Sequence, residues 1–183
     1  MIYDCVPYST DKNLGKAYNE FMSLLPDGSH ACFRDGDTCW LTPDYGMHLA
    51  EYVRLYPNAV LTCFTNRINE KASQQSQIAG IRDIDNLKAH IQYAKEYLKK
   101  IYQVTAIDGF VSGFCMVVPK NVWDKHKFAE KQVYSDRGPY NLLGVDNDFT
   151  NRVRASGTPV LRMDALYIWH TYRLLDNSKN HLL

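Results

Sequence analysis

The sequence lacks both a long apolar run and an excess of charge of either sign. None of its apolar segments approaches the ~18 residues that span a bilayer, and Met1 to Asp4 lack the charged start and apolar stretch of a signal peptide. Lysine and arginine number 21 against 20 aspartate and glutamate residues, a net charge of +1. This balance disfavours nucleic acid and anionic membranes as partners. We therefore expect a cytoplasmic protein without a transmembrane segment that binds no nucleic acid.

Cysteine is sparse and shows no metal-binding or disulfide pattern. The five cysteines are an odd number, and none forms a Cys-x-x-Cys pair. Cys5, Cys32, Cys63 and Cys115 lie in apolar segments, which is typical of buried free thiols in a reducing compartment. Cys39 has no histidine close to it in sequence, and this favours a packing role over a nucleophilic one.

Repeats, low-complexity tracts and linkers are also missing. A chain of 183 residues, 45% of them apolar, is long enough to build one substantial core. We therefore expect a single domain covering residues 1–183.

The first 64 residues alternate between strand and helix patterns. Such an alternation predicts an α/β fold with a mostly parallel central sheet and helices on both faces. The expected order is a strand at 2–7, a helix from Thr10 or Asp11 to Leu25, a strand at 30–33, a helix at 43–56 opened by Thr42 and Pro43, and a strand at 59–64.

The second half continues with short elements separated by two polar or irregular stretches. Residues 65–80 are rich in glutamine, serine and asparagine, and residues 128–143 are aromatic and irregular, so both are expected to be loops. The expected helices are 83–103, 121–126 and 146–155, and the expected strands are 104–107, 112–118, 160–163 and 166–169.

Two carboxylates stand where the second expected strand ends. Asp35 and Asp37 flank Gly36, and residues two apart in an extended segment point the same way. Neighbouring anions repel each other unless a cation or a shared proton intervenes, and oxygen ligands suit Mg²⁺ or Mn²⁺. The alternative is a solvated polar turn.

A second acidic cluster and one histidine follow near the C-terminus. Asp146 and Asp148 stand at an expected helix start, where aspartate serves as a cap and dipole partner or, alternatively, as a general base facing a cleft. His170 follows the last expected strand, and histidine is a common ligand for metals such as Mn²⁺. A structural role for His170 is the alternative.

These motifs recur in an order that is found in a known family. Asn13-x-Gly15, with Asn19 matching loosely, precedes the Asp-x-Asp pair; Ser112-Gly113 opens a strand; Gly-x-Asp-x-Asp opens a helix; and a final strand ends in histidine. The combination resembles the GT-A fold glycosyltransferases, mainly those of family 2, and its C-terminal half is similar to the beta-1,4-galactosyltransferases. The resemblance spans nearly the whole chain.

The resemblance implies a Rossmann-like nucleotide-diphospho-sugar transferase fold with an abbreviated N-terminal half. It also implies an inverting hexosyltransferase, with a galactosyltransferase-like enzyme as one form, that uses Mn²⁺ or Mg²⁺. The implied donor is a nucleotide-diphosphate sugar such as a UDP-sugar, and the acceptor is a glycan or another hydroxyl compound. The implied roles are Asp35 at donor and metal, Asp37 and His170 at the metal, Asp146 as catalytic base with Asp148 beside it, and Pro7, Tyr8, Ser9, Asn13, Ser112 and Gly113 at the donor.

Two departures from the family pattern leave a second interpretation open. The usual second strand, with an aspartate that reads the base, is absent, and Val145 stands where a glutamate usually precedes the catalytic aspartate. A catalytically inactive sugar- or nucleotide-binding module is therefore the alternative function. A metal-dependent phosphoryl-transfer enzyme or nuclease is a third interpretation, which the balanced charge disfavours. Trp40, Tyr134 and Tyr140 are candidates to stack on a sugar or base, and Arg173 to meet phosphate.

Overall fold

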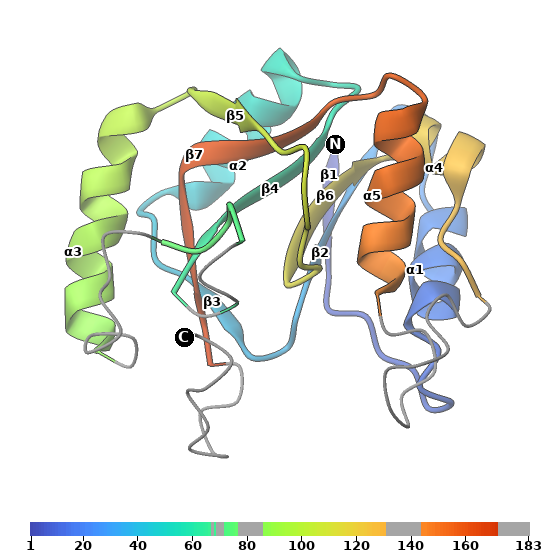
Figure 1. The fold of residues 1–183 in the computed structure, drawn as a ribbon, viewed down its shortest axis with the longest axis horizontal. Coiled ribbons are helices and arrows are strands. Elements are labelled where there is room, and N and C mark those ends of the chain that lie inside the picture. The colour runs from blue at the N-terminus through green and yellow to red at the C-terminus, as the bar shows by residue number, and fades with distance from the viewer. Residues whose placement is uncertain (67, 69–71, 77–85, 131–143, 172–183) are drawn as a thin grey trace. The chain divides into compact units, whose positions relative to one another are not determined.

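A computed structural model describes residues 1–66, 68, 72–76, 86–130 and 144–171 (Figure 1). The chain is α/β, with a mixed seven-stranded sheet in the order β1-β2-β6-β4-β7-β3 and β5 paired to β7. The strands are β1 (Ile2–Cys5), β2 (His30–Arg34), β3 (Thr38–Trp40), β4 (Val60–Thr65), β5 (Val104–Ala106), β6 (Cys115–Pro119) and β7 (Val160–His170). The helices are α1 (Leu14–Ser23), α2 (Tyr45–Leu55), α3 (Leu87–Tyr97) with a 3₁₀ turn η2 (Leu98–Lys100), α4 (Lys120–His126) and α5 (Val145–Ala155).

The expectation of a mostly parallel sheet was wrong. Strands β1 and β2 pair in parallel, but β6 pairs antiparallel with both β2 and β4, and β7 pairs antiparallel with both β3 and β5. The strand β6 thus separates β2 from β4 in the sheet. A fully buried strand such as β6 carries no pattern that reports its direction.

Three further expectations about the elements are corrected. The last strand is continuous from Val160 to His170 rather than divided, and the short strand β3 was not predicted. Helix α1 starts after Asn13, whose side chain accepts the Lys16 N–H, and not at Thr10 or Asp11. Helix α2 starts after Asp44, a residue at φ +52°, so the Thr42-Pro43 start was wrong.

The described chain divides into two compact units, each with its own apolar core. The first comprises residues 1–36, 58–61 and 113–160. Its helices α1, α4 and α5 are grouped together (Figure 1). An aromatic cluster fills its core: Tyr18 of α1 lies 4.5 Å between ring centroids from both Phe33 and Phe128, and Phe128 stacks on Phe149 of α5 at 4.1 Å.

The second unit comprises residues 37–57, 62–112 and those from 161 onward. Its core joins α3 to β4 and β7: Phe64 stacks on Tyr97 at 4.2 Å between centroids, and Tyr97 stacks on Tyr167 at 5.5 Å. The hydroxyl of Tyr167 is 2.6 Å from Nδ1 of the buried His90, which gives both polar groups a partner inside the core. Among the described helices, none has the length and apolar character needed to cross a membrane.

Candidate metal and carboxylate site

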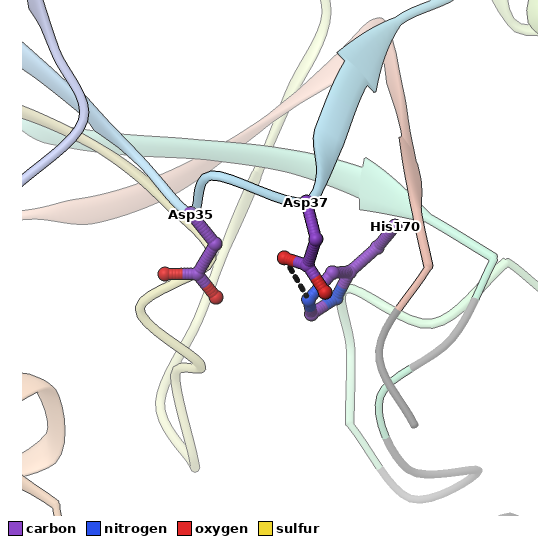
Figure 2. A group of neighbouring side chains, drawn as sticks. All are labelled: Asp35, Asp37 and His170. Carbon is purple, nitrogen blue, oxygen red and sulfur yellow. Dashed lines mark ion pairs between the residues drawn. The ribbon is translucent and has the colours of Figure 1, made fainter. Parts of the chain in front are cut away.

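Strand pairing brings Asp37 and His170 together from opposite parts of the chain. Thr38 of β3 is the register partner of His170, the last residue of β7. Beyond this pair, the N–H and the hydroxyl of Thr171 both donate to the carbonyl oxygen of Asp37 at 3.0 Å. The carboxylate oxygen Oδ1 of Asp37 therefore lies 3.3 Å from Nε2 of His170, an ion pair that Figure 2 shows as a dashed line.

Asp35 completes a group of three potential ligands. One ligand atom from each of Asp35, Asp37 and His170 lies within 4.8 Å of the other two, and Figure 2 shows their side chains near one another. Two carboxylates and one imidazole suit Mn²⁺ better than Mg²⁺, which prefers oxygen ligands alone. The donor set thus fits Mn²⁺, one of the two metals that the family resemblance implies.

The histidine of this group is buried, whereas the aspartate beside it is partly exposed. The side chain of His170 is 4% exposed and that of Asp37 is 45% exposed. The hydrogen bond from His170 lowers the pKa of Asp37, although partial burial acts in the opposite direction. The main chain of His170 is fixed as well, because its N–H donates to Oδ1 of Asn66 at 2.7 Å.

Asp146 is a partly buried carboxylate held by backbone N–H groups. Its Oδ2 accepts the N–H of Gly113 at 2.7 Å, and its Oδ1 accepts the N–H of Asn147 at 2.9 Å. Burial raises its pKa, and these hydrogen bonds offset only part of that effect. Helix α5 starts after Gly144 at φ +89°, so neither Asp146 nor Asp148 is its N-cap residue. Both aspartates lie in the first turn of α5, where their charge favours the helix dipole, and Asp146 also accepts a first-turn N–H. The geometry of Asp146 is that of an oriented, partly buried carboxylate.

Asp35 and Asp146 belong to the same part of the first unit. The N–H of Asp35 donates to the carbonyl oxygen of Phe114 at 3.0 Å, and Phe114 follows Gly113, the residue bonded to Asp146. Both carboxylates also interact electrostatically with Tyr18 and raise its pKa, in addition to the larger effect of burial. Two acids that are distant in sequence are thus joined through one short segment.

Asp148 is engaged elsewhere. Its carboxylate forms an ion pair with Arg152 one turn later in α5, with an N–O distance of 2.7 Å. The same guanidinium donates to the carbonyl oxygens of His126 and Lys127. The hydrogen bonds of Arg152 connect α5 to the end of α4, so Asp148 helps to hold these two helices together.

The predicted donor-binding residues near the N-terminus surround the start of α1. Tyr8 is 83% exposed. The hydroxyl of Ser9 accepts the N–H of Asn13 at 2.7 Å and donates to Asp11 at 2.5 Å. Asn13 also donates from Nδ2 to the carbonyl oxygen of Glu130 at 3.2 Å. Within the described residues, Ser9 and Asn13 shape this turn, and Pro7 and Tyr8 lie in the coil that leads from β1 into it.

Ser112 is held by a residue that the sequence did not single out. Its N–H donates to Oε1 of Gln74, and its carbonyl oxygen accepts from Nε2 of Gln74. Gln74 and Asn66 lie in the stretch that was predicted to be an ordinary polar loop. A buried amide has no sequence signature of its own here, because polar residues are equally common in solvated loops. Trp40 stacks on Tyr45, whereas Tyr134, Tyr140 and Arg173 fall outside the described residues.

No protein-family model and no curated protein matches this chain.

Proposed function

We propose that the chain is an inverting, metal-dependent glycosyltransferase with a GT-A-type, Rossmann-like fold. It would move a sugar from a nucleotide-diphosphate sugar to an acceptor hydroxyl. The observation that carries the proposal is the grouping of Asp35, Asp37 and His170 within one possible coordination sphere. The first two follow one strand and the third ends another, and strand ends are where α/β folds place their ligands.

The ligand group gives the chain a means to hold a nucleotide diphosphate. When bound, a divalent cation supplies positive charge that stabilises the leaving diphosphate. Asp37 and His170 would bind the cation, and Asp35 would lie toward the ribose or sugar. The 3.3 Å distance between Nε2 of His170 and Oδ1 of Asp37 supports this assignment.

Asp146 is the residue we assign as the general base. A single displacement with inversion needs a carboxylate to take the proton of the acceptor hydroxyl on the face of the sugar opposite the leaving group. The raised pKa of Asp146 makes it a stronger base than an exposed aspartate. The Gly113 N–H fixes one of its oxygens and thereby orients the other toward Asn147.

The test is a panel of nucleotide sugars with and without Mn²⁺. We expect Mn²⁺ with the correct donor to raise the melting temperature and to support donor hydrolysis or transfer; ligand at 100 times its Kd adds about 2.7 kcal/mol to the free energy of unfolding. Asp37→Asn should abolish the metal-dependent rise, whereas Asp44→Asn, at an exposed carboxylate before α2, should retain it. An unchanged melting temperature of the wild-type protein across the panel would overturn the proposal.

The inactive binding module is the second outcome that this panel separates. The partial burial of Asp146 and its two backbone partners also suit a purely structural carboxylate. Donor-dependent stabilisation without turnover, unchanged in Asp146→Asn, would identify the module. Turnover that Asp146→Asn abolishes without weakening donor binding would identify the transferase.

A further inference from the structure

A buried polar turn at residues 72–76 forms hydrogen bonds with two backbone segments near the candidate site, at Ser112 and at Asn66. Gln74 is fully buried, with 0% exposure. Its amide is saturated: Nε2 donates to Thr62 Oγ1 at 2.6 Å and to the Ser112 carbonyl oxygen at 3.0 Å, and Oε1 accepts the Ser112 N–H at 2.7 Å. A buried amide with every group paired is a rigid element, since breaking any one bond leaves a desolvated polar group.

The contact with Ser112 replaces a strand partner. The sequence predicted a strand from residue 112, but β6 starts only at Cys115. Ser112 therefore lies outside β6, and the Gln74 side chain bonds both its N–H and its carbonyl oxygen, as a neighbouring strand would. One side chain thus fixes the orientation of the peptide groups on both sides of Ser112.

The turn that carries Gln74 is itself anchored. The N–H of Thr65 donates to the carbonyl oxygen of Gln74 at 2.9 Å, and the N–H of Ser76 donates to that of Thr65 at 2.8 Å. Arg162 of β7 donates to the carbonyl oxygen of Ser73, and its guanidinium stacks over the Phe64 ring at 3.9 Å. The backbone that carries Gln74 is therefore held in place by hydrogen bonds, unlike that of a solvated loop.

We propose that Gln74 is a positioning residue for the transfer reaction: by clamping Ser112 it aims the following N–H, that of Gly113, at the carboxylate of Asp146. The inference rests on the proposed function, in which Asp146 is the base. The space is tight, because a Cβ added at Gly113 would lie 3.1 Å from both Cβ and Oδ2 of Asp146. A small rotation of the Ser112–Gly113 peptide would therefore move the carboxylate.

The adjacent Gln75 contacts Asn66, which binds the backbone of the proposed metal ligand His170, so Gln75 provides a comparison. Gln75 donates from Nε2 to the carbonyl oxygen of Asn66 at 2.6 Å and accepts the N–H of Ile68 at 2.8 Å. Asn66 in turn accepts the N–H of His170. Two neighbouring glutamines thus reach different functional residues, and their substitutions should have different effects.

The test compares Gln74→Met with Gln75→Met and with Gln103→Met, a control at an exposed glutamine. In Gln74→Met we expect amide hydrogen exchange at Gly113 to accelerate at least about tenfold, and kcat to fall about 100-fold, the loss that a 1 Å misplacement produces. The Kd for Mn²⁺ should change less than about twofold. Gln75→Met should instead weaken Mn²⁺ binding, and Gln103→Met should match the wild type.

Unchanged protection of the Gly113 amide in Gln74→Met, or a loss of Mn²⁺ affinity as large as the loss of kcat, would overturn the inference. If Gln74→Met does not fold, Thr62→Val decides, since it removes one of the three bonds of Gln74 and should give a smaller change of the same kind. Exchange at Gly113 is measured without any donor. A wild-type protein that transfers no sugar therefore refutes the proposed function, while the exchange result still tests the clamp.

Discussion

The carboxylate of Asp146 links the site to the stability of the chain. Its pKa is raised by burial, so in the folded state it binds a proton at a higher pH than in the unfolded state. The sign follows from linkage: the group destabilises the fold above its folded pKa, and this destabilisation disappears as the pH falls through that value toward the unfolded value of about 3.9.

We therefore predict that acidification favours the wild-type protein over Asp146→Asn. The free energy of unfolding of the wild type, relative to the variant, should rise as the pH falls through this window. Urea denaturation at a series of pH values measures the difference. Asp27→Asn, at an exposed carboxylate, controls for the general effect of removing a charge. A difference between wild type and Asp146→Asn that does not depend on pH would contradict the prediction.

Gly113 offers a second test at the scale of one residue. Gly113→Ala places a methyl group 3.1 Å from Oδ2 of Asp146, closer than an ordinary contact, so the carboxylate must shift. We expect kcat for sugar transfer to fall about 10- to 100-fold, with Mn²⁺ affinity retained because the metal ligands lie on other residues. Steady-state kinetics and Mn²⁺ titration check this; Gly109→Ala, where an added Cβ meets nothing within 4 Å, is the control.

Single residues also show where prediction from sequence succeeds. The grouping of Asp35, Asp37 and His170 followed from one physical rule, that side chains at strand ends converge on one edge of a sheet. Gln74 was missed because its importance lies in burial and in partners at residues 62 and 112. No local pattern distinguishes such a glutamine from a solvated one.

At the scale of elements, helix α1 is held by a close backbone approach. A Cβ at Gly15 would lie 1.9 Å from the carbonyl oxygen of Ala129. Nearby, the side chain of Asn19 donates to the Phe128 carbonyl oxygen at 2.9 Å and accepts the Trp123 Nε1–H at 2.8 Å. The Asn-x-Gly-x-x-x-Asn pattern of α1 thus fastens the segment after α4 to this helix.

We predict that Gly15→Ala lowers the free energy of unfolding by about 1–3 kcal/mol or more, because the backbone of Ala129 must move. Gly46→Ala in α2 meets nothing within 4 Å and replaces a helical glycine, so it should stabilise by about 0.5–1 kcal/mol. Urea unfolding measures both. Equal effects of the two substitutions would show that the close approach is not a constraint.

Thr42 shows why the predicted start of α2 was wrong. Its hydroxyl accepts the Tyr167 N–H at 2.8 Å and donates to the Ala165 carbonyl oxygen at 3.4 Å, so it serves β7 rather than a helix cap. Thr-Pro is a good helix start in isolation, and the tertiary bond overrides it.

We predict that Thr42→Val lowers the free energy of unfolding by about 1–3 kcal/mol, because the N–H of Tyr167 is left buried without this acceptor. Thr10→Val, at an exposed position, should change the free energy by less than about 0.5 kcal/mol. Chemical denaturation of both variants compares the two. Similar small values would mean that the hydroxyl of Thr42 contributes nothing to β7.

At the scale of the whole molecule, the strand and helix content was largely predictable, but the strand directions were not. Apolar runs identified β4 and β6 as buried strands, yet burial carries no information on direction. The position of β6 between β2 and β4 is fixed by contacts distant in sequence. Strand pairing of this kind depends on long-range contacts that no local sequence pattern encodes.

The five cysteines allow a prediction for the whole chain. All are free; Cys39 is exposed, Cys5 is half-buried and the others are buried. Burial also raises the pKa of Cys5 to about 11, which leaves little reactive thiolate. We expect a thiol reagent to modify one cysteine quickly in the native protein and all five after unfolding. Cys39→Ser should remove the fast phase; a fast phase that persists in this variant would contradict the assignment.

The unbroken course of β7 has a consequence for how the chain can vary. Successive side chains of a strand project from alternate faces, so one inserted or deleted residue within β7 would reverse the side from which His170 projects. The number of residues between the buried Tyr167 and His170 therefore has to stay odd or even as it is now, so that the imidazole keeps its face of the sheet. Length changes that preserve the position of the histidine must fall before Val160 or beyond the strand, whereas substitutions within β7 leave this alternation unchanged.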